Sequence, residues 1–230
     1  MSVDLDQAGA VVSEPNPCPL CGLPLYGWIM LPPRSAIASV GMPLATPPGD
    51  ERVIDRCESC GVALEHDREI DLSAEWEAVR RPAAPGTSEV AVPDRASLQA
   101  WIGTEGWAAI GIEPGSLMLT PSSLELLAQR NGCQLTRKRW PLWGRAQAWM
   151  WQTLLNGLTF HPNFAREVRS GRLRPGTANR LRFAVDAIVT VLAAPLVALV
   201  SVPIEVGAAL VHRGGELVAT ARPSPDRQVA

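Results

Sequence analysis

Four of the five cysteines form two matching pairs that could bind a metal ion. Cys18 and Cys21 enclose Pro-Leu, Cys57 and Cys60 enclose Glu-Ser, and a glycine follows the second cysteine of each pair. Two such turns can supply four thiolates at the roughly 2.3 Å distance that tetrahedral Zn²⁺ requires. Glycine permits the left-handed backbone that turns amide N–H groups toward the sulfurs. The pattern therefore predicts a zinc ribbon with the ligands Cys18, Cys21, Cys57 and Cys60.

The donor set favours a structural metal over a catalytic one. Four thiolates fill a tetrahedral site and leave no open position for water. A structural zinc stabilises a small unit whose own core is insufficient to fold. A thioredoxin-like redox role is disfavoured because one pair would suffice and the βαβ context is missing. Iron accepts the same ligands, with zinc as the default.

The charges divide the chain into two unlike parts. Residues 1–90 carry 14 acidic and 6 basic side chains, whereas residues 91–230 carry 9 acidic and 15 basic ones, and the net charge is −2. Such an asymmetry suggests two units that face different environments. The first 17 residues are acidic and contain no apolar stretch. A cytoplasmic protein with reduced cysteines is therefore expected.

Turn formers and capping residues indicate where short elements begin and end. The sequence predicts a helix over 71–81, followed by a Pro- and Gly-containing linker over 81–86. Thr120 suits a helix N-cap because Pro121 follows at the first helical position. Asn131-Gly132 would end that helix, because glycine readily adopts the left-handed conformation found after helix ends.

A series of motifs follows from residue 88 onward. A β-rich run ends in proline, and then come a Ser-Leu step, a tryptophan, a Thr-Pro-Ser-Ser-Leu helix start, a Gly-Cys strand start and a final Gly-Gly strand. In order, these are residues 90–93, Ser97-Leu98, Trp107, 120–127, 132–136 and 214–222. The succession resembles the C-terminal half of class I S-adenosylmethionine-dependent methyltransferases, in which 90–93, 132–136 and 214–222 would be the fifth, sixth and seventh strands. Some methyltransferases of this type also begin with a zinc module of two C-x-x-C pairs.

The resemblance implies an ancestry and a partial fold. The family binds its cofactor on a glycine-rich turn after the first strand. Nothing between Gly61 and Val90 supplies that turn, and the 28 intervening residues are too few for four strands and their helices. We therefore expect an α+β fold: a four-cysteine zinc ribbon, a truncated methyltransferase-like sheet and a hydrophobic helical hairpin. No catalytic or S-adenosylmethionine-binding residue is assigned.

Residues 130–182 are both basic and rich in tryptophan. They contain 11 Arg or Lys and a single acidic residue, Glu167. Tryptophan suits a membrane interface because its apolar ring carries one N–H donor, and arginine favours anionic headgroups. A Trp-rich core helix with a solvated arginine face fits the pattern equally well, and nucleic acid is a third, less favoured interpretation. The candidate membrane or partner contacts here are Trp140, Trp143, Trp149, Trp151, Arg166, Arg169, Arg172 and Arg174.

The run 187–204 has no charged residue and lies between Asp186 and Glu205. One helix of this length would span about 27 Å, slightly less than the roughly 30 Å hydrocarbon core of a bilayer. Pro195 lacks a backbone donor and favours a break. We therefore expect two short helices in a hairpin that dips into one leaflet, with Leu192, Pro195 and Leu196 among its contacts. A fully soluble hairpin would require another protein surface to cover it.

These patterns divide the chain into five parts and leave three functions open. The parts are the zinc ribbon (1–70), a short helix and linker (71–86), the methyltransferase-like remnant (87–139), the Trp/Arg-rich and hydrophobic insertion (140–212), and the last strand with the tail (213–230). The favoured function is a zinc-binding, non-catalytic accessory protein at the inner face of the membrane or on a partner protein, such as a complete methyltransferase. The alternatives are a methyltransferase whose cofactor half comes from another chain, and a zinc-ribbon module that binds nucleic acid or protein.

Overall fold

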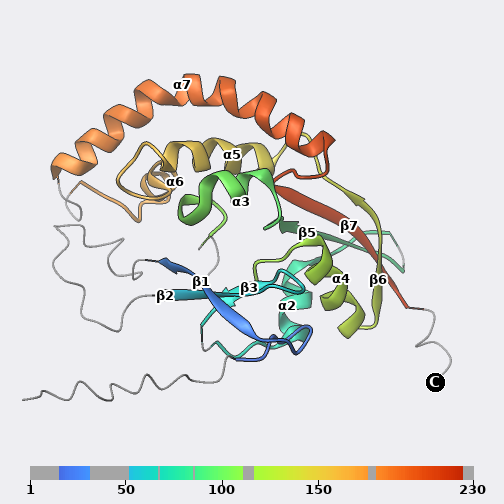
Figure 1. Ribbon diagram of the computed structural model, residues 1–230. Coiled ribbons are helices and arrows are strands. Elements are labelled where there is room, and N and C mark those ends of the chain that lie inside the picture. Colours follow the sequence, from blue (N-terminus) through green and yellow to red (C-terminus); the bar gives the residue numbers. More distant parts are fainter. Residues whose placement is uncertain are drawn as a thin grey trace, which may run out of the picture.

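The computed structural model combines helices with two antiparallel sheets, so the predicted α+β class is confirmed (Figure 1). The proline-rich loop between the cysteine pairs, at 32–51, lies outside the residues that the structure describes, and so does the end of the tail. The described residues are 16–31, 52–66, 68–84, 86–110, 117–175 and 180–224.

The first sheet contains the cysteine turns. Its strands β1 (Leu25–Leu31), β2 (Arg52–Cys57) and β3 (Ala63–Glu65) follow one another and pair antiparallel. The first cysteine turn comes just before β1, and the second joins β2 to β3. Leu25 is the register partner of Cys57. This pairing brings the two turns to the same end of the sheet.

The second sheet has the strand order β4-β5-β7-β6, with each pair of neighbours antiparallel. Its strands are β4 (Arg80–Pro82), β5 (Ser88–Pro93), β6 (Cys133–Arg139) and β7 (Glu216–Pro223). The β-rich runs expected near 90, 133 and 216 are therefore strands. The predicted linker is in part wrong, because Arg80–Pro82 pairs with β5 and makes a hairpin instead of a free connection.

Two helices predicted from capping signals are present. Helix α2 (Leu72–Val79) begins after Asp71, whose carboxylate accepts hydrogen bonds from the next turn. Helix α4 (Pro121–Arg130) begins after Thr120, which forms a reciprocal capping box with Ser123. Both helices pack near the second sheet, while the short α3 (Leu98–Gly103) and the 3₁₀ turn η1 (Thr104–Gly106) lie near β1 and α5 (Arg145–Asn156).

The apolar run belongs to one long helix, and the predicted hairpin is wrong. Helix α7 (Arg180–Leu210) is continuous through Pro195 and Pro203 and arches over α5 and α6 (Phe164–Arg169) (Figure 1). A proline removes one helical hydrogen bond and favours a bend. Packing along α5 compensates for that loss, since Val197, Ser201 and Ala208 are buried on the inner side. The prolines are therefore accommodated within a curved helix.

The cysteine turns and the second sheet share one hydrophobic core. This cluster unites Cys57 and Cys60 with Val90, Leu124 and Leu217. A second cluster beneath β1 and β2 is centred on Trp107, which is 1% exposed. The predicted boundary at 71–86 therefore does not separate two cores, and the cysteine turns pack into the same core as the second sheet.

Candidate metal centre

The four cysteines of the two turns meet in one cluster. The Sγ atoms of Cys18, Cys21, Cys57 and Cys60 all lie within 4.8 Å of one another. The closest cross-turn approaches are 3.6 Å between Cys18 and Cys60 and 3.4 Å between Cys21 and Cys57. Four sulfurs at these separations surround a point that a tetrahedral metal ion can occupy. The sulfurs are mutually close in the way that the paired C-x-x-C spacing predicts.

Local backbone geometry aims each turn at the cluster. Gly22 and Gly61 have φ angles of +78° and +77°, the left-handed region predicted for them. The N–H of Gly22 donates to the Cys18 carbonyl at 2.8 Å, and the N–H of Gly61 donates to the Cys57 carbonyl at 3.0 Å. The two turns therefore repeat the same conformation.

Burial and hydrogen bonding shift the pKa values of the cysteine thiols in opposite directions. Burial raises the pKa of the Cys18 and Cys60 thiols, because the low-dielectric interior disfavours thiolates. Burial acts in the same direction on Cys57, but the main-chain N–H of Cys60 and the Cys21 thiol lower the pKa of Cys57 to about 7. A divalent ion would stabilise all four thiolates together, since metal binding deprotonates its cysteine ligands.

Three side chains from the rest of the chain hold the turns in place. Thr120 donates a hydrogen bond of 2.9 Å to the Cys60 carbonyl, and Arg95 donates one of 3.1 Å to the Gly61 carbonyl. Arg130, in the last turn of α4, donates to the Leu20 carbonyl at 3.0 Å. Helix α4 therefore contacts one cysteine turn at each of its ends. The sequence marks Thr120 as a helix cap but does not reveal this second role.

Two of the predicted contact tryptophans are bound into the fold. Trp140 is half-buried, donates to Asp94 Oδ2 at 2.9 Å, and its ring centroid lies 5.0 Å from that of His212. Trp151 is half-buried and donates to the Ala194 carbonyl of α7 at 3.2 Å. These bonds make Trp140 and Trp151 packing residues between elements.

The other two tryptophans differ in exposure. Trp149 is half-buried, with the guanidinium of Arg145 5.6 Å from its ring centroid. Trp143 is 64% exposed. Of the four predicted contacts, Trp143 therefore presents the largest fraction of its surface to solvent.

The predicted arginine and apolar contacts lie on the outside. Arg169, Arg172 and Arg174 are exposed and follow or end α6, whereas Arg166 is half-buried. Arg172 lies 3.8 Å from Glu167, which is a surface ion pair. Leu192, Pro195 and Leu196 are exposed on α7. The basic segment thus leads to the beginning of the apolar helix.

Both carboxylates that flank the apolar run point into the protein. Asp186 accepts hydrogen bonds from the main-chain N–H groups of Phe160 and His161 and contacts His161 Nδ1 at 2.5 Å. Glu205 accepts from Gln99 Nε2 at 2.6 Å and from the Gly215 N–H at 2.7 Å. Both side chains are fully buried. The acidic residues that would oppose membrane contact are therefore removed from the helix surface.

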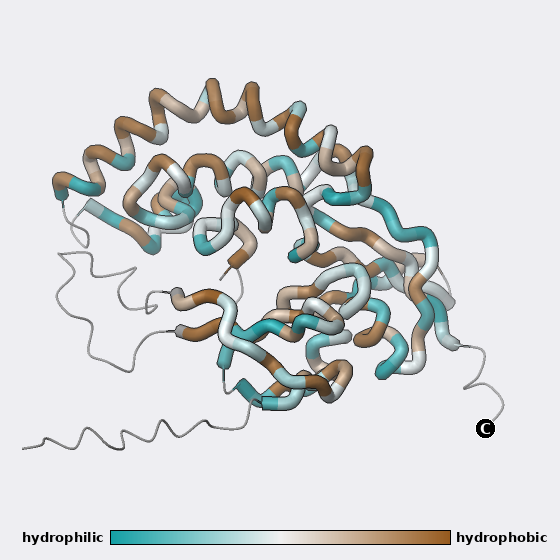
Figure 2. The backbone as a smooth tube through the Cα atoms, in the orientation of Figure 1, coloured by the Kyte–Doolittle hydropathy of each residue, from teal (hydrophilic) through white to brown (hydrophobic). Residues whose placement is uncertain are grey.

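The opposite side of α7 is apolar and exposed, and we call it the outer face. Figure 2 shows hydrophobic residues along the whole helix. By length and composition α7 could cross a membrane, although such helices also occur in soluble proteins. The outer face comprises Leu181, Val185, Ile188, Val191, Leu192, Leu196, Leu199, Val200 and Leu210, which are 36–74% exposed.

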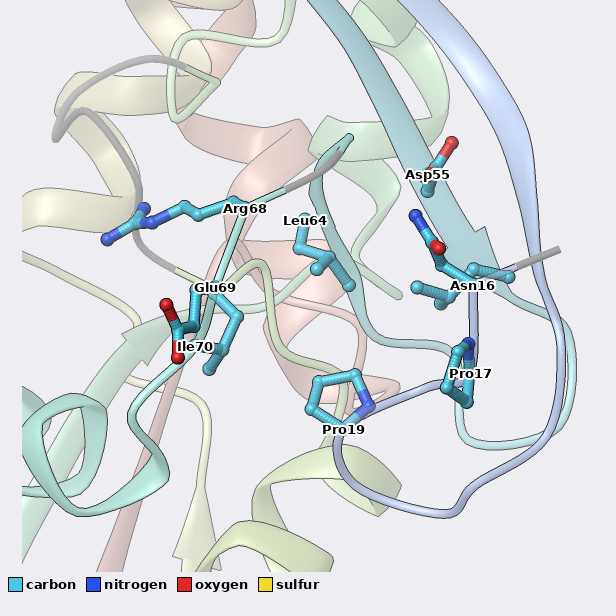
Figure 3. A pocket seen from close by; sticks show the side chains of 9 residues that line it. Asn16, Pro17, Pro19, Asp55, Leu64, Arg68, Glu69 and Ile70 are labelled. Carbon is cyan, nitrogen blue, oxygen red and sulfur yellow. The ribbon is translucent and has the colours of Figure 1, made fainter. Parts of the chain in front are cut away.

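A small cavity of about 330 Å³ lies behind the first cysteine turn (Figure 3). Pro17, Pro19 and Leu64 form its apolar lining. Arg68 also borders it, but Figure 3 shows its guanidinium directed away from the other labelled side chains. That guanidinium lies 3.6 Å from Glu75. Asn16, Asp55 and Glu69 also line it, so both apolar and polar side chains border this cavity.

No family model, curated protein sequence or solved structure matches the chain. The fold and the site define an α+β protein with a four-cysteine cluster compatible with a metal site and one long, largely exposed apolar helix. The function must be argued from these two features.

Proposed function

We propose that this protein is a zinc-stabilised peripheral membrane protein that rests on the bilayer surface through the outer face of α7. The proposal is based on the difference between the exposed and the buried side of this helix. Its exposed side is apolar from Leu181 to Leu210, while Asp186 and Glu205 are turned inward and hydrogen-bonded. Apolar patches of this extent are typical of membrane or protein contact sites.

Packing supports an orientation in the membrane plane. The 31 residues of α7 extend over about 46 Å, well beyond a hydrocarbon core of roughly 30 Å. The inner side packs on α5, which contains buried Gln152 and Thr153. A spanning α7 would draw these polar groups and both carboxylates into lipid, at a cost of several kcal/mol. Insertion of the outer face alone avoids that cost.

The basic segment supports a lipid surface over a purely apolar partner. Arg169, Arg172 and Arg174 precede the helix, so exposed cations lie before the beginning of the outer face. Each basic residue near an anionic bilayer contributes about 1 kcal/mol of attraction. Apolar insertion combined with such a basic flank is the pattern of monotopic anchoring.

The cysteine cluster is proposed to hold a structural Zn²⁺ that fixes the two turns against α4. Four thiolates leave no position for substrate, so the metal stabilises and does not catalyse. The resemblance to class I methyltransferases is retained as a proposed ancestry. The segments that it names as fifth, sixth and seventh strands are neighbours in one sheet, which supports that origin. On this proposal the protein is a non-catalytic accessory to a membrane-associated process.

Vesicle flotation tests the membrane contact. The wild-type chain should float with vesicles of phosphatidylcholine and phosphatidylglycerol. Leu192→Glu with Leu199→Glu should weaken binding about 100-fold or more, because two leucines then no longer enter the apolar layer. These side chains are 74% and 72% exposed, so the fold should persist. The matched control is Tyr26→Glu with Met30→Glu, which adds the same charge at exposed apolar positions on β1.

The outcomes distinguish a membrane from a protein as the partner of the outer face of α7. A wild-type chain that stays unbound and monomeric without detergent would refute the membrane proposal. A chain that stays unbound but self-associates through the outer face would identify a protein contact instead. Equal loss of binding in both double variants would show that general charge, and not α7, determines the result.

A further inference from the structure

An open cleft of about 820 Å³ lies between the metal-binding unit and helices α3 and α4. Three arginines from distant parts of the chain line it: Arg56 of β2, Arg95 after β5, and Arg213 before β7. The sequence gives no sign of this cluster, because the three positions are separated by at least 39 residues. The cleft is separate from the outer face of α7.

The arginines bring positive charge to the cleft. Within the described part of the chain, none of the three forms an ion pair, although the charge of Arg213 acts on Asp94, and Glu58 and Glu105 also border the cleft. The Nε atoms of Arg56 and Arg95 are buried and have no hydrogen-bond partner. An unsatisfied buried donor costs about 1–3 kcal/mol, and more when it is charged. A bound anion would remove this cost.

Arg95 is held rigidly at the cleft wall. Its guanidinium lies 4.1 Å from the ring centroid of Trp28, and it donates to the Gly61 carbonyl. Burial and the charge of Arg56 lower the pKa of Arg95 to about 10, so Arg95 remains cationic at neutral pH. Arg56 and Arg95 are thus held near one another, and the Nε donor of each has no acceptor in the protein. Such preorganisation is what an anion site requires.

The beginning of helix α4 adds to the same wall. Thr120, Pro121 and Ser122 border the cleft, and Ser122 is exposed. A helix N-terminus carries a partial positive charge and favours anions such as phosphate. The arginine cluster and the helix end therefore act in the same direction.

We propose that this cleft binds the phosphate group of a small soluble ligand of mononucleotide size. Arginine forks and helix N-termini both suit a tetrahedral oxyanion with several acceptor oxygens. A volume of about 820 Å³ is within the range of small-molecule sites. At the rim, the indole of Trp101 is 72% exposed and offers a flat surface on which a planar ring can stack. The phosphate lies against the arginines, and the ring lies toward Trp101.

Calorimetric titration of the full metal-loaded chain with inorganic phosphate and with adenosine monophosphate tests the site. Both should bind, the nucleotide more tightly. Ser122→Glu should weaken both by about tenfold or more through like-charge repulsion, while an acidic residue in the first helical turn keeps α4 stable. The matched control is Ser73→Glu, the same change at the second position of α2, which lies outside the cleft. It should change neither affinity.

A further variant tests whether Trp101 contacts the ring of the nucleotide. Trp101→Ala should reduce the nucleotide affinity to that of phosphate. The competing explanation is that Arg56 and Arg95 only balance the negative charge of a four-thiolate metal centre. In that case Ser122→Glu leaves phosphate binding unchanged, or no phosphate binds at all. Either result overturns the proposal.

Discussion

The hydroxyl of Thr120 donates a hydrogen bond of 2.9 Å to the main-chain carbonyl of Cys60, across 60 residues of sequence. The same oxygen accepts from the N–H of Ser123 and so caps helix α4. One side chain thus begins a helix and fixes a metal-binding turn. The position of the second cysteine turn and the start of α4 are therefore coupled.

Replacing Thr120 should weaken both features together. Thr120→Val keeps the shape but removes the cap and the bond to Cys60, so unfolding should become easier by about 1–2 kcal/mol. Urea denaturation of the metal-loaded protein measures this. Thr120→Ser retains the hydroxyl and should stay close to wild type. Faster metal loss to a chelator in Thr120→Val alone would demonstrate the coupling, and equal rates in both variants would argue against it.

The two glycines that follow the cysteine pairs should respond unequally to alanine. Both have a left-handed φ, which costs a non-glycine residue roughly 1–2 kcal/mol. A Cβ on Gly22 meets nothing within 4 Å, whereas one on Gly61 would lie 2.8 Å from Thr120 Cγ2. Gly61→Ala should therefore reduce the melting temperature more than Gly22→Ala. Similar losses would show that the Thr120 contact is easily relieved.

Metal content should depend on the cluster and not on the fifth cysteine. Cys57→Ser should lose most bound zinc, and Cys133→Ser should retain one ion per chain, as measured by mass spectrometry of the intact protein. Affinity should fall as the pH is lowered, because protons compete for the thiolates and burial raises the pKa of Cys18. Cobalt substitution should give the absorption of a tetrahedral thiolate site. A Cys57→Ser protein with full zinc content would exclude this assignment.

Glu205 should matter more for its acceptor oxygens than for its charge. Glu205→Leu leaves the Gly215 N–H and one N–H of the Gln99 amide buried without an acceptor, at about 1–3 kcal/mol for each donor, while the Gln99 amide keeps its bond to the Ala146 carbonyl. Glu205→Gln keeps one acceptor oxygen for these donors. The melting temperature of Glu205→Leu should be well below that of Glu205→Gln. The reverse order would mean that α7 tolerates an apolar inner face.

The basic segment should govern lipid selectivity. Neutralising Arg169, Arg172 and Arg174 to glutamine should reduce binding to phosphatidylglycerol-containing vesicles by roughly 100-fold, at about 1 kcal/mol per residue. Binding to pure phosphatidylcholine should not change. Added salt should weaken vesicle binding by the wild-type protein toward the level of the variant. A salt-independent wild type would rule out an electrostatic contribution.

Local signals could be predicted, and long-range pairings could not. The C-x-x-C turns with their glycines and the Thr120–Pro121 helix start are set by neighbouring residues, and they appear as expected. The hairpin prediction failed because the penalty at Pro195 is local, whereas the packing of α7 on α5 depends on distant residues. The burial of Glu205 rests on Gln99, more than a hundred residues away in the sequence.

The cleft illustrates the same limit. None of Arg56, Arg95 and Arg213 stands out in its own segment of the sequence. They line one cleft only because distant elements of the chain pack together. The first sheet places Arg56, and one end of the antiparallel β5–β7 pair, where Pro93 is the register partner of Glu216, places the other two. Counts of charged residues over long segments of the sequence do not reveal a cluster of this kind.

Because the cysteines belong to the same core as Val90 and Leu217, loss of the proposed zinc ion would disturb the second sheet as well as the cysteine turns. Copies made during zinc starvation would then be more open to proteases. The abundance of this protein would then follow the cell's zinc supply without any dedicated sensor.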